Sequence, residues 1–248
     1  MRNNFHVHPF RNRRLWSLYP SVLKEEPLMR IDWSVFDKII YINLKERNDR
    51  RDSIEKELQL LGVPNQKIHR LDAKRHLIGQ IGCAQSHLEA IETAIAQGWG
   101  NILILEDDMV FNKDQDAIAR LSYFLQALKR VSWQAAFLSA NYRKVVTFKT
   151  TDKLIRPLDA LCACAYAVQA DYRATLRECF AGAVERLRKG GGKYDHAVDV
   201  AWLPLMQQHA WLGMYPVAGH QAPGRSDIEN GVMDYTKHFY KSLAAIAQ

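Results

Sequence analysis

Three consecutive carboxylates, Glu106, Asp107 and Asp108, follow the aliphatic run at residues 102–105. Like charges this close repel one another, and taking a carboxylate out of water costs several kcal/mol unless a cation compensates it. These residues therefore either lie in solvent in a loop or face a positive partner. In an extended strand Glu106 and Asp108 share one face while Asp107 points to the other. Two carboxylates on one face can hold a hard divalent cation, which in turn binds a diphosphate.

A second pair of carboxylates, Asp195 and Asp199, stands four residues apart near the start of a predicted helix. Residues at this spacing can share a helix face, and a carboxylate beside a hydroxyl group can act as a general base. Both have a structural alternative, because Asp195 suits an N-cap and Asp199 an exposed first turn that the helix dipole favours. The pair predicts either a proton acceptor or the beginning of a helix.

Polar residues also follow the first predicted strand at residues 36–44, where Asn43, Arg47, Arg50 and Arg51 are found. Arginine in a first helical turn opposes the helix dipole, so these side chains are not placed there for helix stability. An arginine at this position can meet a phosphate group. The alternative is a solvated, charged first turn.

A second group, Ser86 and His87, stands in the first turns of a predicted helix, behind Gly79 and Gly82. Free backbone N–H groups at such a helix start can bind an anion. The alternative for His87 is a half-buried side chain that packs on the sheet.

The elements that must position these residues alternate along the chain. Apolar runs predict strands at 36–44, 67–73 and 101–108, and apolar residues three and four apart predict helices between them. This order predicts an α/β fold with a mostly parallel central sheet flanked by helices. In such a sheet ligands gather at the carboxyl ends of the strands, where the three acids lie. Further strands are expected at 135–140, 144–149, 160–169 and 211–217, and further helices at 113–130, 171–189 and 195–209.

The composition narrows the class of protein. The chain has 248 residues, with 34 Lys and Arg against 27 Asp and Glu, which gives a net charge of +7. This balance suits an anionic partner, such as nucleotide phosphates, a nucleic acid or an acidic membrane face. No run approaches the roughly 20 apolar residues of a membrane span, and no secretory signal is recognisable, so we expect a cytoplasmic protein. The four cysteines form no CxxC pair and are expected to be free thiols.

Residues 1–34 differ from the rest of the chain, because they mix arginine with tryptophan and tyrosine and show no clear hydrophobic periodicity. We interpret them as an N-terminal extension, followed by one domain at 35–248. Arginine with aromatic residues suits an anionic membrane interface, so peripheral contact at the inner face of a membrane is one expectation. An arm that packs on the domain or stays disordered is the other.

Several blocks of the sequence, in this order and spacing, resemble glycosyltransferase family 25, the lipooligosaccharide and collagen sugar transferases of the GT-A fold. They are "IIYINLKERNDRR", "IGQIGCAQSHLEAI", "ILILEDDMVF", "CACAYAVQA", "HAVDVAWLPL" and "HQAPGRSDI". The resemblance runs from about residue 36 to residue 230. One departure is clear: Cys162 and Ala163 stand where the family has Gly-Thr.

The resemblance implies a GT-A-like (Rossmann-like) domain that transfers a hexose, galactose or glucose, from a UDP-sugar to a glycan or glycolipid hydroxyl with inversion. It also implies roles for individual residues. The acids would act as the metal-binding motif, in which Glu106, Asp108 and His220 hold Mn²⁺ (or Mg²⁺). Asp199, with Asp195 beside it, would supply the base. The donor would contact Asn43, Arg47, Arg50, Ser86, His87, Glu106, Asp107, Gln221 and Ser226.

Two rival functions remain from the sequence alone. The first is a protein that binds a nucleotide sugar without catalysis. The second is a basic nucleic-acid binder that uses the arm and the arginines near residue 50. Phosphate backbones avoid carboxylates, so the three acids argue against the second rival.

Overall fold

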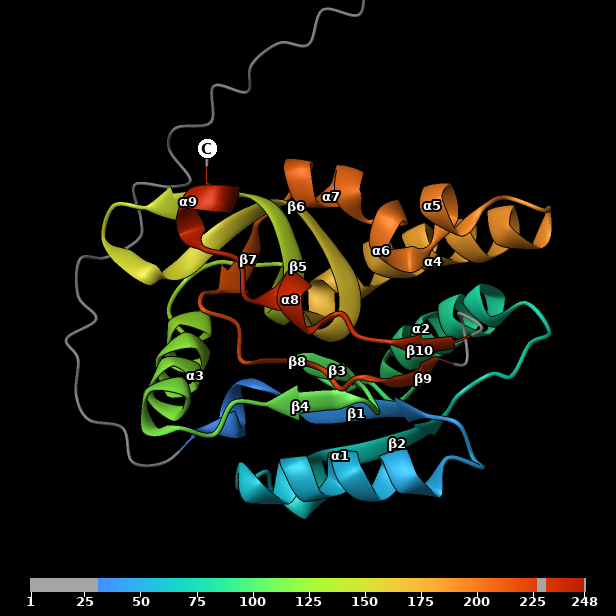
Figure 1. Cartoon of the computed structure of the whole chain (residues 1–248), viewed down its shortest axis with the longest axis horizontal. Helices are drawn as coiled ribbons and strands as arrows, with labels where there is room; N and C mark the ends of the chain where they lie inside the picture. The colour runs from blue at the N-terminus through green and yellow to red at the C-terminus, as the bar shows by residue number, and fades with distance from the viewer. Residues whose placement is uncertain (1–30, 227–230, 248) are drawn as a thin grey trace, which may run out of the picture.

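A computed structural model describes residues 31–226 and 231–247 of the chain. Its centre is a six-stranded sheet in the order β2-β1-β3-β6-β5-β7. Five strands run in one direction, and β6 runs against all three of its neighbours. The predicted mostly parallel α/β sheet is therefore confirmed (Figure 1). The strands are β1 (Lys38–Asn43), β2 (Ile68–Asp72), β3 (Ile102–Glu106), β5 (Ala135–Phe148), β6 (Thr151–Val168) and β7 (Trp211–Met214).

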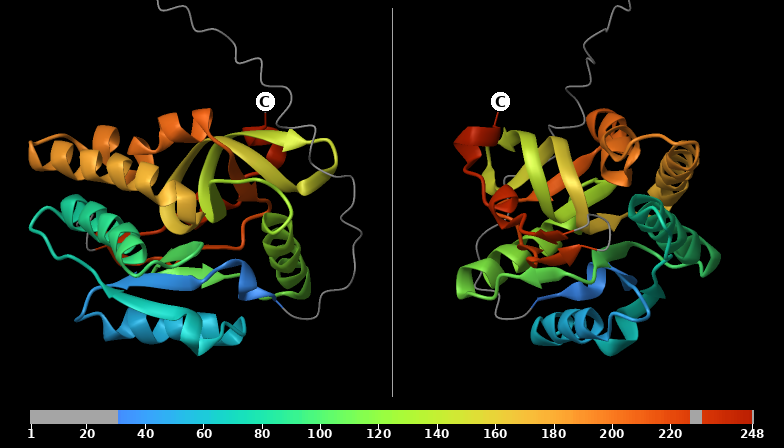
Figure 2. Two further views of the ribbon diagram at one scale, coloured as in Figure 1. Left: turned by 180° about the vertical axis from the view of Figure 1, so that it is seen from behind. Right: turned by 45° about the vertical axis from the view of Figure 1, so that its right-hand side comes forward.

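Four long helices cover this sheet, as the apolar periodicity predicts. They are α1 (Asn48–Leu60), α2 (Gly79–Ala96), α3 (Gln115–Leu128) and α4 (Arg173–Arg188). Figures 1 and 2 show α1 and α2 on opposite sides of β1, with α4 beside α2. Helix α1 begins at Asn48, and Arg47 before it makes no side-chain capping bond. Gly62, at a φ of +67°, follows its end.

The second half of the sheet departs from the predicted segments. The strands expected at 135–140 and 144–149 form the single strand β5, which pairs with β6 along a long, irregular hairpin. The helix expected at 195–209 is three short helices, α5 (Lys193–His196), α6 (Val198–Ala201) and α7 (Leu203–Gln208). Ala197 interrupts the run with an extended ψ of 154°. Pro204 lies in the first turn of α7, where its missing N–H costs nothing.

The C-terminal part of the chain is more ordered than its composition suggests. Strand β4 (Met109–Phe111) pairs with β8 (Gly219–Gln221), and β9 (Gly224–Ser226) pairs with β10 (Gly231–Met233). Short helices α8 (Thr236–Phe239) and α9 (Leu243–Ile246) follow. Figure 1 shows β8 and β9 lying close to β3 and β4. The last segment of the chain is thereby brought to the edge of the sheet where the three acids lie.

An aromatic cluster connects the short helices to the sheet. Trp202 packs against Phe137, Tyr166 and Trp211, with ring centroids 5.2, 5.4 and 5.6 Å apart. These rings are fully buried, and edge-to-face pairs of this kind stabilise a core beyond their buried area. The cluster fixes Tyr166, whose hydroxyl group reaches the site described below.

Residues 31–34, the end of the predicted extension, pack against the domain. Ile31 and Trp33 are buried, and Trp33 Nε1 donates a hydrogen bond of 3.1 Å to the Leu61 carbonyl oxygen. This segment runs into the short 3-10 helix η1 (Trp33–Val35). The rest of the predicted extension, residues 1–30, lies outside the described residues. Within the part that is described, the chain has no helix with the length and apolarity to cross a membrane.

Candidate functional site

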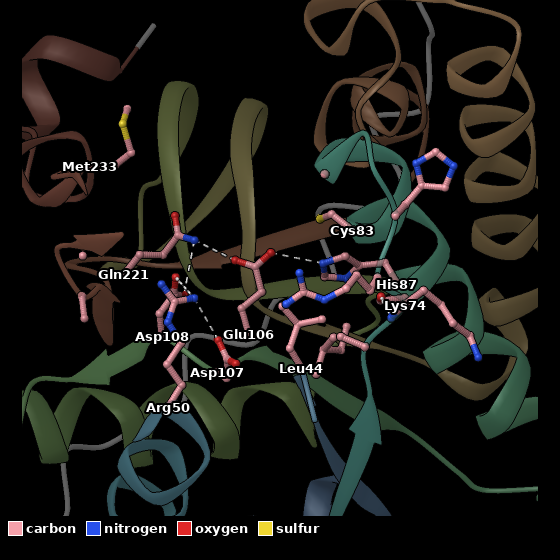
Figure 3. Close-up of a pocket in the computed structure, with 18 of the residues that line it drawn as sticks. Leu44, Arg50, Lys74, Cys83, His87, Glu106, Asp107, Asp108, Gln221 and Met233 are labelled. Carbon is pink, nitrogen blue, oxygen red and sulfur yellow. Dashed lines mark hydrogen bonds and ion pairs between the residues drawn. The ribbon is translucent and has the colours of Figure 1, made fainter. Parts of the chain in front are cut away.

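The three acids, here called the acidic edge (Glu106, Asp107 and Asp108), lie at the carboxyl end of β3 on the wall of a cavity (Figure 3). Gln221 Nε2 donates to Glu106 Oε2 over 2.7 Å and to Asp108 Oδ1 over 3.5 Å. The prediction that Glu106 and Asp108 share a face is therefore confirmed. Gln221, a predicted donor contact, lines the same cavity.

Asp107 also lines the cavity and is held by two side chains. Asn43 Nδ2 donates to its Oδ2 over 2.7 Å, and Arg50 Nη1 to its Oδ1 over 3.2 Å. Asn43 is buried, and it also donates to the Arg47 carbonyl oxygen and accepts a bond from Arg70 Nε. These contacts use its whole amide group, and it is not part of the cavity wall. Asn43 thus positions Asp107 and does not reach the cavity, which differs from the donor contact that the resemblance implies.

The predicted arginines separate into one that faces the cavity and others that pair locally. Arg50 Nη1 also lies 3.5 Å from Asp108 Oδ2, while its Nη2 donates to the Arg225 carbonyl oxygen over 3.0 Å. Arg47 pairs with Asp49 at 2.9 Å and is not among the residues of the cavity wall. Only Arg50 of the predicted arginines is brought to the site.

The acidic edge carries more negative charge than its neighbours compensate. Burial, together with the charge of Glu106, raises the pKa of Asp108 to about 7 despite the nearby Arg50. Burial likewise raises the pKa of Asp107. A carboxyl group whose charged form is disfavoured in this way is one that a cation would stabilise.

Helix α2 supplies the opposite wall through Cys83, Ser86 and His87. His87 is buried, and its Nδ1 lies 2.9 Å from the Tyr166 hydroxyl, while its Nε2 lies 3.3 Å from Glu106 Oε1. Ser86 Oγ donates to the Gly82 carbonyl oxygen and accepts from the Lys74 backbone N–H. Ser86 and His87 therefore line the cavity as predicted, although the hydroxyl of Ser86 is engaged within the protein.

Gly82 is needed for the close approach of the loop before α2. A Cβ at this position would lie 2.4 Å from the Lys74 carbonyl oxygen, far inside van der Waals contact. This loop carries Lys74, Arg75 and His76 along the rim of the cavity. Sequence reasoning missed these three residues, although a cluster of basic residues just before a helix that lines the site was a usable signal.

Sequence reasoning also missed Cys83. Its sulfur atom, a ring nitrogen of His87 and an oxygen of Glu106 lie within 4.8 Å of one another, a grouping that could hold a metal ion. Cys83 and His87 are four residues apart on α2, so one helix turn brings both to the same face. All four cysteines of the chain are free thiols, as expected.

His220 does not join the acidic edge, contrary to the predicted metal site. It pairs with Val110 in the β4–β8 ladder, and its Nδ1 lies 2.9 Å from the Tyr240 hydroxyl. Successive side chains of a strand point to opposite faces. Because Gln221 faces the acids, its neighbour His220 faces away from them, and Gln221 takes the place that was predicted for His220.

The two predicted catalytic acids lie in different surroundings. Asp195 is exposed in α5 and is not on the cavity wall. Asp199 is the second residue of α6, and its Oδ2 accepts a hydrogen bond of 3.0 Å from the Cys162 backbone N–H. Burial raises the pKa of Asp199, and the negative charge of Glu106 raises it further. Asp199 is thus within electrostatic reach of the acidic edge without lining the cavity itself.

The left-handed conformation of Cys162, with a φ of +71°, is the only positive φ of a non-glycine residue in the described chain. This region favours glycine, which is the residue that the resembled family has here. The conformation directs the Cys162 N–H to Asp199. The side chain of Ser226, another predicted donor contact, lies outside the described part of the structure.

Residues 63–181 match the model of glycosyltransferase family 25, described as an LPS biosynthesis protein. This match identifies a glycosyltransferase family 25 domain within the chain. The matched segment contains α2, the acidic edge and all of β6, and thus most of the cavity wall described above. The protein is accordingly a glycosyltransferase enzyme.

Two solved structures show a more distant likeness, and no curated protein matches the chain. One is mannose-1-phosphate geranyltransferase from Thermus thermophilus, 12% identical, with a TM-score of 0.41 over 76% of each chain. The other is apo UDP-glucose pyrophosphorylase, 10% identical, with a TM-score of 0.42 over 74% of this chain and 75% of that one.

Proposed function

We propose that this family 25 glycosyltransferase is a metal-dependent inverting hexosyltransferase. It would move galactose or glucose from a UDP-sugar to a hydroxyl group of a glycan or glycolipid. The observation that carries the proposal is the convergence of Glu106 and Asp108 on one cavity wall, with a charge that Arg50 leaves partly uncompensated.

The residues at the acidic edge fit a hard divalent cation, Mn²⁺ or Mg²⁺. Carboxylate oxygens are the ligands such ions prefer, and the raised pKa of Asp108 indicates a place where positive charge is missing. Glu106 and Asp108 would hold the ion together with the diphosphate of the donor. The ion would stabilise the negative charge that develops on the departing diphosphate.

Basic side chains around the cavity support an anionic donor. Arg50 lies beside Asp108, and Lys74 and Arg75 line the rim. Their charges would attract the two phosphate groups and hold them against the acidic edge. Arg50 is also anchored through its second nitrogen to the Arg225 carbonyl oxygen, so its guanidinium group is oriented before any ligand binds.

Asp199 is our candidate for the base that removes the proton of the acceptor hydroxyl as the hydroxyl attacks the sugar. Its raised pKa brings it closer to the operating pH of an enzyme, where a general base is most effective. The Cys162 N–H fixes one of its oxygens. The exposed Asp195 has no comparable surroundings, so we assign the base to Asp199 alone.

The observed ion pairs disfavour the nucleic-acid rival. Arg47 pairs with Asp49 and Arg51 with Asp52, and Arg50 faces the acidic edge rather than an open surface. Local carboxylates thus neutralise Arg47 and Arg51, two of the arginines that would have contacted a phosphate backbone. The proposed peripheral contact of residues 1–30 with a membrane stays a prediction from composition.

Calorimetry with UDP, with and without Mn²⁺, tests the proposal, followed by an assay of UDP release from UDP-galactose and UDP-glucose. The wild-type protein should bind UDP more tightly with Mn²⁺ and release UDP when an acceptor is present. Asp108→Asn should lose the Mn²⁺-dependent gain and reduce transfer by roughly 10²-fold or more.

The exposed Asp152 at the start of β6 provides a matched control. Asp152→Asn removes the same charge and should behave like the wild type. UDP affinity that does not respond to Mn²⁺ would contradict the metal-dependent mechanism. Metal-dependent binding without any UDP release from either sugar would instead favour the rival that binds a nucleotide sugar without catalysis.

A further inference from the structure

The group formed by Cys83, His87 and Glu106 offers ligands of a different chemistry from the acidic edge. A thiolate and an imidazole are softer ligands than carboxylates and favour Zn²⁺ over Mn²⁺ or Mg²⁺. We propose that Cys83, His87 and Glu106 form a zinc site whose occupation competes with the hard cation for Glu106. The zinc site stands independently of the proposed function, and only the competition rests on it.

The geometry is close to that of a tetrahedral zinc centre. Zinc–ligand distances of about 2.0–2.3 Å place neighbouring ligand atoms roughly 3.4 Å apart. His87 Nε2 and Glu106 Oε1 are already 3.3 Å apart. The three ligand atoms lie within 4.8 Å of one another. A side-chain rotation of Cys83 or Glu106 that moves its ligand atom by roughly 1 Å would therefore bring all three atoms to the spacing of zinc ligands.

Elements around the group hold its ligands in place. Cys83 and His87 face the cavity from one helix turn of α2, and Glu106 approaches from the end of β3 (Figure 3). The Tyr166 hydroxyl, 2.9 Å from His87 Nδ1, leaves Nε2 as the nitrogen that faces Glu106. An outer partner of this kind orients a ligating histidine and fixes its tautomer.

All three side chains line the cavity, so an ion can enter from it and a fourth position stays open to a water molecule or a ligand. Glu106 is shared with the acidic edge, where it and Asp108 contact the same Gln221 nitrogen. A zinc ion bound to Cys83 and His87 would withdraw Glu106 from the Mn²⁺ ligands. Zinc should therefore inhibit transfer, and added Mn²⁺ should relieve the inhibition.

Cobalt spectroscopy tests the site without any nucleotide sugar, so its outcome does not depend on the proposed function. Titration of the metal-free full chain with Co²⁺ should give a sulfur-to-cobalt charge-transfer band that saturates at one ion per chain, and Zn²⁺ should displace it. Cys83→Ser should abolish the band and weaken zinc binding at least 10-fold. Tyr166→Phe should weaken zinc binding about 10-fold, as loss of an outer partner does.

Cys179→Ser is the matched control, because Cys179 is a half-buried free thiol on α4 that is not on the cavity wall. This variant should keep the band and the affinity. A band that persists in Cys83→Ser, or that disappears in Cys179→Ser, would overturn the assignment.

A measurement on the wild-type protein avoids any question of whether a variant folds. Zn²⁺ should slow the alkylation of Cys83, followed by mass spectrometry of its peptide, while the rate at Cys179 stays unchanged. Equal alkylation of Cys83 with and without Zn²⁺ would also overturn the proposal.

Discussion

Two regions of this molecule bury carboxylates in different ways. The acidic edge holds three acids by side-chain contacts from Asn43, Arg50, His87 and Gln221, and the pKa of Asp108 is raised. Asp199 lies against the Cys162 backbone N–H instead. The first region is short of positive charge, which an exchangeable ion can supply. In the second region a backbone N–H group holds the single carboxylate of Asp199 in place. Under the proposed function the first region would bind the cation and the second would accept the proton of the acceptor hydroxyl.

The strongest test of this comparison is Asp199→Asn. The amide keeps the shape of the side chain but cannot accept the hydroxyl proton, so transfer should fall roughly 10²-fold or more. Binding of UDP with Mn²⁺ should be unaffected, because that depends on the acidic edge. Calorimetry and an assay of sugar transfer measure the two effects separately. Normal turnover in this variant would remove Asp199 from the mechanism.

The second test uses the pH dependence of stability in the absence of metal. Folding raises the pKa of Asp108 from 3.8 to about 7, so the folded state resists loss of this proton. Stability should therefore fall as pH rises through this range, and Asp108→Asn should not show this loss. We expect the variant to be more stable than the wild type at pH 8 by on the order of 2 kcal/mol.

Urea unfolding in the presence of a chelator, at about pH 4.5 and about pH 8, measures this difference. The advantage of the variant should be several-fold smaller at the lower pH, which lies only slightly above the ordinary pKa of 3.8 at which the unfolded chain begins to lose the proton. Mn²⁺ at pH 8 should stabilise the wild type more than the variant. A constant difference between the two proteins at both pH values would show that the charge of Asp108 is compensated.

The smallest expected effect concerns the backbone beside Asp199. Cys162 adopts a φ of +71° that glycine tolerates without strain. Relief of this strain should slightly exceed the entropic cost of glycine in the unfolded chain, so Cys162→Gly should stabilise the protein by about 0.5 kcal/mol. Cys164→Gly, in the same strand but without a positive φ, should destabilise it by about 1 kcal/mol or more. Thermal unfolding measures the stability of the two variants. Equal losses of stability in both would contradict the prediction.

The acidic edge was predictable because its signal is local. Alternation along a strand placed Glu106 and Asp108 on one face and Asp107 on the other, and the strand–helix order placed all three at a carboxyl edge. The same rule would have separated His220 from Gln221 if the sequence had shown that these residues form a strand. Strand β8 has only three residues and exists by pairing with β4, and such a short partner-dependent strand leaves no periodic pattern.

The surroundings of Asp199 were less predictable, because they depend on contacts between distant segments. Residues 195–209 have a helical pattern, yet the extended backbone at Ala197 and the position of Pro204 divide it into three helices. Asn43 looked like a ligand contact, but only the tertiary structure shows that Asp107 and Arg70 occupy its amide. Cys83 was visible as the residue four before His87, but nothing local indicated that Glu106 would approach both.

The pairing of β4 with β8 has a consequence for how the protein gains activity during synthesis. Gln221 contacts Glu106 across 115 residues of sequence, so the cavity lacks this wall until residues 219–221 have been synthesised and paired with β4. A chain interrupted before residue 219 would still contain β1, β2 and β3 but would leave the acids open on one side. A chain that stops before residue 219 should therefore fold its first strands without gaining the proposed activity.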